Sequence, residues 1–192
     1  MLEIVVPFRG ETAKRRLRGD LHPLPELPRA MLRDVLEACR LVGRTIVVSA
    51  SPVDEPDVEL VHDDGLGQGR AVAAALKYVG DGPVLVVNAD LPCVRADDLR
   101  RLADAIGPDG LALVEAADGT TNALALARAS LFRPVYGPSS ATRFRELAPS
   151  HAVAIPNLAD DVDELDDVFR LAARLGRHSR ALLAAWRAAA AS

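Results

Sequence analysis

Cysteine, histidine and aromatic side chains are scarce in this sequence of 192 residues. Aromatic residues make up 4% of the chain, and there are only two cysteines and four histidines. Cys39 and Cys93 lie far apart in apolar surroundings, without the spacing of a zinc site or a disulfide framework. We therefore expect two buried structural thiols and the reducing conditions of a cytoplasm. The histidines are scattered, so the sequence offers no histidine or cysteine constellation for catalysis.

Long apolar runs and a surplus of positive charge are also missing. No stretch approaches the length of a membrane span, and residues 1–10 are too short and too soon interrupted for a signal peptide. The net charge of -4 argues against a surface dedicated to nucleic acid. We expect a cytoplasmic protein that binds neither membrane nor nucleic acid.

The remaining composition is that of an ordinary globular protein, with 49% hydrophobic and 26% charged residues. These fractions exclude the disordered and fibrous classes. The length suits one domain with a sizeable core. Residues 1–192 are therefore expected to form a single domain.

The stretch VLVVNADLP at 84–92 is the feature around which we interpret the chain. Its first four residues are apolar without alternation, which is typical of a strand buried on both faces of a parallel sheet. Asp90 follows that strand, at the edge of the sheet where open α/β proteins bind their ligands. A carboxylate there is well placed to hold a cation. The alternative is that Asp90 only begins a turn or caps the next helix.

Apolar runs and helical periodicities alternate along the chain, which predicts an α/β fold with a mostly parallel central sheet flanked by helices. We expect strands at 2–6, 45–49, 58–61, 84–87, 111–115, 123–127 and 152–155. We expect helices at 28–42, 70–79, 96–106, 141–148 and 164–175. A final alanine-rich helix from Arg177 is expected to pack Leu182, Leu183 and Trp186 onto the body.

Several loops at the strand-to-helix junctions have the composition of ligand sites. The loop 8–20 is basic and contains two glycines, which suits phosphate, although a solvated basic loop has the same composition. The segment HDDGLGQG at 62–69 leads into a helix but matches neither a Walker motif nor a dinucleotide fingerprint. The loops 116–122 and 136–140 place hydroxyl residues beside glycines, as a pocket for a carboxylate or phosphate requires. Ordinary turn chemistry favours the same residues there.

A second acidic group follows the last expected strand, at Asp160, Asp161 and Asp163. Together with Asp90 it offers the carboxylate oxygens that one or two magnesium ions prefer, with substrate phosphates as further ligands. Transfer of a phosphoryl or nucleotidyl group needs little else, because positioning and charge neutralisation supply most of the catalysis. The alternative is a solvated helix start, where acidic side chains suit the helix dipole.

The motifs that connect these features occur in a fixed order: PFR…AKRRL at 7–17, NADLP at 88–92, GTTNALAL at 119–126, YGPSS at 136–140 and DDVDELDD at 160–167. Over residues 2–176 the chain resembles the guanylyltransferases that activate 2-phospho-L-lactate or phosphoenolpyruvate in the biosynthesis of the deazaflavin coenzyme F-420. The resemblance implies a three-layer, Rossmann-like nucleotidyltransferase fold related to the molybdopterin guanylyltransferases. It also implies GTP as co-substrate, magnesium as cofactor and pyrophosphate as product.

Carried over by position, the resemblance implies that Asp90 and Asp161 hold magnesium ions, with support from Asp163, and that these ions grip the acceptor's phosphate. Lys14 would meet the triphosphate of GTP and complete the catalytic set. An oxygen of the acceptor phosphate would attack the α-phosphorus of GTP, so the reaction needs no protein nucleophile or strong general base. The lack of a histidine or cysteine constellation agrees with this mechanism.

The resemblance also implies two binding regions. The acceptor's carboxylate would be bound by backbone groups and one hydroxyl, from Thr121, Gly137 and Ser140. The nucleotide would be bound by the basic first loop and the glycine-rich loop, through Arg9, Lys14, Arg16, Gly67, Gln68 and Gly69.

The sequence departs from the family pattern at three places. Arg9 stands where lysine is common, which keeps the charge. Residues 67–69 replace an asparagine of the second loop, in the region that the resemblance assigns to the nucleotide. Phe144 stands near a usual histidine and removes a polar group from the expected acceptor pocket.

Two other classes of function stay open. A related nucleotidyltransferase for a sugar phosphate or a molybdopterin usually begins with a glycine-rich loop that residues 5–10 do not match. A non-catalytic nucleotide-binding domain would keep the fold without turnover. Between the two acceptors, the arginine- and alanine-rich composition resembles actinobacterial members of the family and favours phosphoenolpyruvate. The expected partners are GTP and a three-carbon phosphorylated acid, with hand-off to the next enzyme of the pathway.

Overall fold

The computed structural model describes residues 2–10 and 25–190 and confirms an α/β fold. The strands are Glu3–Phe8 (β1), Arg44–Ser49 (β2), Glu59–His62 (β3), Val84–Val87 (β4), Leu111–Glu115 (β5), Thr121–Leu126 (β6) and Ser150–Ala152 (β7). The α-helices are Leu27–Arg40 (α1), Gln68–Ala75 (α2), Ala96–Asp104 (α3), Ser140–Arg145 (α4), Pro156–Ala159 (α5), Leu165–Arg170 (α6) and Arg177–Ala190 (α7). Two short 3-10 helices are Leu76–Tyr78 (η2) and Ala129–Leu131 (η3).

These strands form one seven-stranded sheet in the order β3-β2-β1-β4-β6-β5-β7. β1 pairs in parallel with β2 and β4, β2 with β3, and β5 with β7. Among the described strands, β6 alone runs antiparallel to its neighbours, β4 and β5. The sheet is therefore mostly parallel, as expected, and the carboxyl ends of β1, β2 and β4 meet at one edge.

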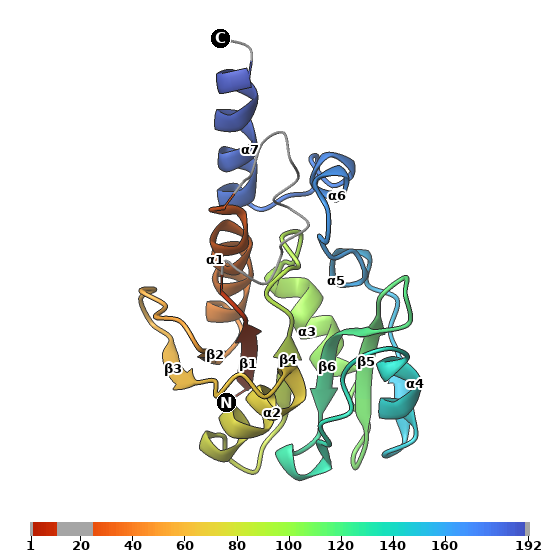
Figure 1. The fold of residues 1–192 in the computed structure, drawn as a ribbon. Helices are drawn as coiled ribbons and strands as arrows, with labels where there is room; N and C mark the ends of the chain where they lie inside the picture. Colours follow the sequence, from red (N-terminus) through yellow and green to blue (C-terminus); the bar gives the residue numbers. More distant parts are fainter. Residues whose placement is uncertain (1, 11–24, 191–192) are drawn as a thin grey trace.

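Helices cover both faces of the sheet, which gives three layers (Figure 1). On one face α1, α3 and α5 pack against strand residues such as Val6 and Leu85. On the other face α2 and α4 pack against residues such as Val5 and Val86. Since successive strand residues point to opposite faces, both layers are needed to bury the unbroken apolar run of β4, whose four residues are all fully buried.

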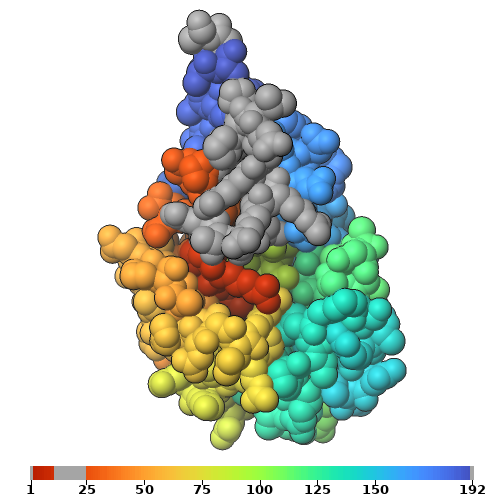
Figure 2. Space-filling model, viewed as in Figure 1, coloured from red at the N-terminus to blue at the C-terminus, as the bar shows by residue number. Residues whose placement is uncertain are grey.

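A smaller apolar cluster joins the C-terminal helices to α1. Met31 of α1, Leu171 and Leu183 are buried together, and Leu182 and Trp186 lie partly buried against them. The expected packing of the final helix is therefore confirmed. Beyond this contact α7 extends away from the sheet and forms the narrow end of the molecule (Figures 1 and 2).

Both cysteines are buried free thiols, as expected. Burial raises the pKa of Cys39 to about 12, and it also raises the pKa of Cys93. Because the thiolate is the reactive form, these environments keep both side chains inert at neutral pH. Separately, none of the helices that the structure describes combines the length and apolarity needed to cross a bilayer.

The chain after β5 differs from the expected pattern. The sequence predicts a strand at 152–155, but β7 ends at Ala152, and Ile155 already precedes α5. Pro156 supplies the reason, because a residue without an amide hydrogen suits the first position of a helix better than a paired strand. The helix expected at 164–175 is also shorter, since α6 ends at Arg170 and the chain continues in turns.

Candidate active site

Asp90 follows β4 at the carboxyl edge of the parallel strands, as the sequence predicts. Its backbone carbonyl accepts a hydrogen bond from the amide of Val162 at 3.1 Å. The Val162 side chain is fully buried in the cluster that joins α1, α6 and α7. These two contacts hold the acidic segment 160–163 across the end of β4.

The carboxylates of Asp90, Asp161 and Asp163 converge at this place, with one oxygen from each lying within 4.8 Å of the others. Asp90 and Asp161 are half-buried and Asp163 is exposed, so the group is open to solvent on one side. Magnesium prefers carboxylate oxygens, and three negative charges at this spacing repel one another unless a cation compensates them. The donor set and its exposure therefore fit a divalent metal ion that also binds a ligand.

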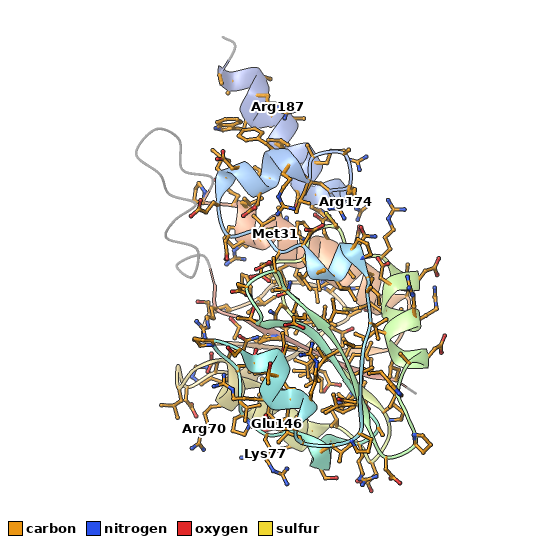
Figure 3. The ribbon with its side chains drawn as sticks, turned by 90° about the vertical axis from the view of Figure 1, so that its right-hand side faces the viewer. Met31, Arg70, Lys77, Glu146, Arg174 and Arg187 are labelled. Atoms are coloured by element: carbon orange, nitrogen blue, oxygen red, sulfur yellow. The ribbon has the colours of Figure 1, made fainter. Side chains whose placement is uncertain are left out.

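Neighbouring ion pairs hold the acidic segment 160–163 in place. Asp160 pairs with Arg174 and, at 2.9 Å, with Arg170, which also pairs with Asp167 at 2.8 Å. Asp167 accepts the amide of Asp163 at 3.0 Å. Burial opposes ionisation of Asp160 and Asp167, but the arginine hydrogen bonds prevail and lower the pKa of both carboxyls. Figure 3 shows Arg174, the partner of Asp160, beside the C-terminal helices.

The glycine-rich loop forms the turn into α2. Gly65 and Gly67 have φ angles of 75° and 94°, which glycine adopts readily, and a Cβ at either would meet no atom of residues 2–10 and 25–190 within 4 Å. Asp63 accepts the Gly65 amide at 2.9 Å and so closes the turn. A Cβ on Gly69 would lie 2.9 Å from the Cα of Pro134. The backbone is thus open at Gly65 and Gly67 and closely packed at Gly69. Figure 2 shows the start of α2, in yellow, in contact with the segment that follows η3, in teal.

Three carboxamides connect this loop with the rest of the site. Gln68 Nε2 donates to Asn88 Oδ1 at 2.7 Å, and the Asn88 backbone amide donates to the Asn122 carbonyl at 3.0 Å. Asn122 Nδ2 donates to the carbonyl of Ala159 at 3.1 Å, directly before the acidic segment. Sequence reasoning names Gln68 but misses Asn88 and Asn122. The signal that could have drawn attention to both is a carboxamide next to an apolar strand, directly after β4 for Asn88 and at the second position of β6 for Asn122.

The residues named for the acceptor's carboxylate also lie together. Thr121 opens β6 and Ser140 opens α4, and the Ser140 hydroxyl accepts the Thr121 amide at 2.9 Å. The two hydroxyl oxygens are 3.2 Å apart, and both residues are buried. Gly137 has a φ of 112° and accepts the Ser140 amide at 3.0 Å. Because Thr121 and Ser140 bind each other here, a carboxylate that used both groups would have to replace that contact.

Phe144 has a different setting from the one expected of a residue near the acceptor pocket. It is fully buried, with its ring centroid 6.0 Å from that of Phe132 and 5.1 Å from that of Tyr136. Burial also raises the pKa of the Tyr136 hydroxyl. Phenylalanine at this position therefore belongs to the core beneath α4, and its effect on Ser140 acts through packing.

The basic first loop can be placed only in part. Arg9 is exposed directly after β1. Gly10 has a φ of 76°, and a Cβ there would lie 3.0 Å from Ser51 Oγ. Lys14 and Arg16 lie outside the described residues, so their contacts with phosphate stay predictions.

A second group of titratable side chains, Asp34, Glu37 and His178, also brings one ligand atom from each within 4.8 Å. Asp34 is 4% exposed and accepts the amides of His178 and Ser179 at 2.9 and 3.0 Å, which caps the N-terminus of α7. Glu37 pairs with Arg177, whose positive charge compensates it. These contacts show that the group connects α1 with the N-terminus of α7.

Comparison with known proteins identifies the family of this chain. The model of the MobA-like NTP transferase domain matches residues 15–154. A phosphoenolpyruvate guanylyltransferase of Roseiflexus castenholzii is 33% identical, and the match covers 95% of this chain and 93% of that protein. A 2-phospho-L-lactate guanylyltransferase of Haloarcula marismortui is 31% identical, with 96% of this chain and 90% of that protein covered.

A solved structure shows the same fold at lower identity. The 2-C-methyl-D-erythritol 4-phosphate cytidylyltransferase of Thermus thermophilus is similar with a TM-score of 0.64 and 17% identity, over 94% of this chain and 97% of that one. The layered sheet, the converging carboxylates and the nearly full-length relatives point in one direction. The chain belongs to the MobA-like NTP transferases and, within them, to the family of phosphoenolpyruvate and 2-phospho-L-lactate guanylyltransferases.

Proposed function

We propose that this chain transfers the guanylyl group of GTP to a three-carbon phosphorylated acid, phosphoenolpyruvate or 2-phospho-L-lactate, and releases pyrophosphate. It does so as a single nucleotidyltransferase domain over residues 1–192, in the cytoplasm, during biosynthesis of the deazaflavin coenzyme. The product then passes to the next enzyme of that pathway. Relatives that bear the names of both acceptors support the proposal.

The observation that carries the proposal is the convergence of Asp90, Asp161 and Asp163 within 4.8 Å. A helix cap at Asp90 would not require two more carboxylates beside it. A solvated helix start would not bring Asp161 against the end of β4. Phosphate chemistry assisted by a metal ion accounts for all three side chains at once.

Asp90, Asp161 and Asp163 would hold magnesium, which supplies charge neutralisation for the phosphates when it is bound. The acceptor is oriented so that an oxygen of its phosphate forms the new bond to the α-phosphorus of GTP. The bond between the α-phosphorus and its bridging oxygen to the β-phosphorus breaks, and pyrophosphate leaves with that oxygen. The proton state of the protein does not change, which explains why no general base is needed.

The remaining loops orient the two substrates. Gly65 and Gly67 leave the backbone before α2 open to close approach by the nucleotide. Arg9 adds positive charge after β1, at the same edge of the sheet. Thr121 and Ser140 bind the acceptor's carboxylate once it displaces their mutual hydrogen bond.

The experiment supplies the purified protein with GTP, Mg2+ and each acceptor separately, and measures release of pyrophosphate. The next enzyme and a deazaflavin precursor are included to trap an unstable product. We expect release only when both an acceptor and Mg2+ are present, and faster release with phosphoenolpyruvate. ATP and CTP in place of GTP, and a sugar phosphate in place of the acceptor, are the controls. If GTP binds but neither acceptor supports turnover, the chain is a nucleotide-binding domain and the proposal fails.

A further inference from the structure

Asn88 and Asn122 are polar residues beside and within strands that are otherwise mostly apolar. Asn88 directly follows the fully buried strand β4, and Asn122 lies in β6, whose six residues are all buried. A buried carboxamide costs free energy unless its donors and acceptors find partners. Asn122 is buried and Asn88 is half-buried, and the partners of their side chains lie in three different elements, α2, β6 and α5.

Asn88 connects the glycine-rich loop with the start of β6. Its side-chain oxygen accepts Gln68 Nε2 at 2.7 Å, in the first turn of α2. Its backbone amide donates to the Asn122 carbonyl at 3.0 Å. Its Nδ2 lies 3.4 Å from the Thr121 carbonyl, which is a long and weak hydrogen bond. Because the same short segment continues into Asp90, the position of the glycine-rich loop is tied to that of a candidate metal ligand.

Asn122 connects β6 with the other two carboxylates. Its Nδ2 donates to the carbonyl of Ala159 at 3.1 Å, at the end of α5, and Asp161 follows two residues later. The backbone amide of the neighbouring Thr121 donates to the hydroxyl of Ser140, at the end of the loop 136–140. The start of β6 is therefore bonded to the end of α5, directly before the acidic segment 160–163 (the metal-binding segment), and to Ser140 at the end of the loop 136–140 (the acceptor loop).

We propose that Asn88 and Asn122 are positioning residues that join the glycine-rich loop, the acceptor loop and the metal-binding segment into one unit of fixed spacing. The inference rests on the proposed function for what each loop binds. Neither carboxamide needs to touch a substrate, since Asn88 acts through Gln68 and Asn122 acts through Ala159. Loss of Asn122 should therefore weaken metal binding even in the absence of nucleotide.

The test measures binding instead of turnover. Mn2+ is the metal probe, followed by electron paramagnetic resonance, and GTP binding is followed by calorimetry. Asn122→Ala removes the donor to the Ala159 carbonyl and is expected to weaken Mn2+ binding about 10-fold, as is common when groups that orient metal ligands are removed. Asn88→Ala removes the acceptor of Gln68 and is expected to weaken GTP binding by about 3- to 10-fold, the effect of one lost hydrogen bond.

Thr45→Val is the matched control. Thr45 is a buried polar strand residue at the amino end of β2, and its hydroxyl makes no hydrogen bond with the part of the chain that the structure describes. The Thr45→Val variant should bind Mn2+ and GTP with the affinities of the wild type. Circular dichroism establishes that each variant is folded, and Asn122→Ser replaces Asn122→Ala if the alanine variant does not fold.

The outcomes separate the inference from the proposed function. Folded Asn122 variants that bind Mn2+ as tightly as the wild type, or an Asn88→Ala variant with unchanged GTP binding, overturn the positioning roles. Selective loss of Mn2+ affinity in Asn122→Ala, with Thr45→Val unaffected, supports them. A wild-type protein that binds neither Mn2+ nor GTP overturns the proposed function, and the inference with it.

Discussion

The amide of Val162 donates to the carbonyl of Asp90 at 3.1 Å, and this bond joins two segments that are distant in the sequence. Because it uses only backbone atoms, it leaves the carboxylates of Asp90, Asp161 and Asp163 available to face one another. The buried Val162 side chain fixes the position of the acidic segment 160–163 relative to the end of β4. The backbone bond and the burial of Val162 together place Asp161 and Asp163 beside the end of β4.

Asp90→Asn should abolish turnover with little effect on folding, since it keeps the shape of the side chain and removes its charge. We expect a loss of more than about 100-fold in pyrophosphate release, because a direct metal ligand is lost. Thermal unfolding should change little. Asp109→Asn is the control, because Asp109 is 75% exposed and precedes β5 at the opposite edge of the sheet. Near-normal activity of Asp90→Asn would remove Asp90 from the metal site.

Ser140→Ala should weaken binding of the acceptor more than binding of GTP. The substitution removes the hydroxyl that is proposed to bind the acceptor's carboxylate, and it also leaves the buried Thr121 amide without its partner in the free protein. We expect the KM for the acceptor to rise about 10-fold, with a small change for GTP, in steady-state kinetics with each substrate varied in turn. Ser150→Ala, in the edge strand β7, should leave both values unchanged. Equal increases for the two substrates would contradict a role in the acceptor loop.

The stabilisation that Asp160 and Asp167 contribute should be lost in acid, so the free energy of unfolding should fall there. Their folded-state pKa values are lowered by arginine contacts, so their stabilisation is complete above the unfolded-state pKa of about 4 and is lost as the pH falls through the lower folded values. Asp160→Asn should therefore flatten the decline in the free energy of unfolding between about pH 5 and pH 2. Denaturant titrations at a series of pH values measure this slope. An unchanged slope would show that the ion pairs with Arg170 and Arg174 do not persist in solution.

Asp34→Ala should destabilise the protein without changing its activity. The variant leaves the amides of His178 and Ser179 without their cap, and we expect the free energy of unfolding to fall by about 2 kcal/mol. Chemical denaturation followed by circular dichroism gives the value. Glu37→Gln is the comparison, since Glu37 does not cap the helix and should have a smaller effect. A matching loss of guanylyl transfer would assign the Asp34 group to the active site instead.

Cys39 and Cys93 should resist thiol reagents in the folded protein at pH 8. Burial both shields them and raises their pKa values, to about 12 in the case of Cys39. Both should react rapidly once the protein is unfolded in denaturant, as measured with a chromogenic disulfide. Fast labelling of either thiol under native conditions would show that its surroundings open more readily than the structure indicates.

Much of the fold can be predicted from the sequence, because the strands of a helix-covered sheet leave a strong apolar signal. The run at 84–87 identifies β4 correctly because both of its faces are buried. Helix α5 has four residues, about one helical turn, and so gives no periodicity to detect. The antiparallel direction of β6 depends on pairing with β4 and β5, which local sequence does not encode.

The candidate site shows the same limit. Asp90, Asp161 and Asp163 are identified by residue type and by resemblance, but their closeness comes from the Val162 backbone bond and from burial of that side chain. Asn88 and Asn122 lie in the motifs at 88–92 and 119–126, but their residue type alone does not assign them a role. Their importance depends on hydrogen bonds to distant parts of the chain, which cannot be recognised before the structure is known.

The order of the carboxylates along the chain also affects when the protein becomes competent during its synthesis. Asp161 and Asp163 follow every strand of the seven-stranded sheet, and Val162 is buried only when α6 and α7 close over it. A chain that has reached residue 159 contains all seven strands but only one of the three converging carboxylates. The group of three carboxylates is therefore complete only in a chain that extends through residue 163.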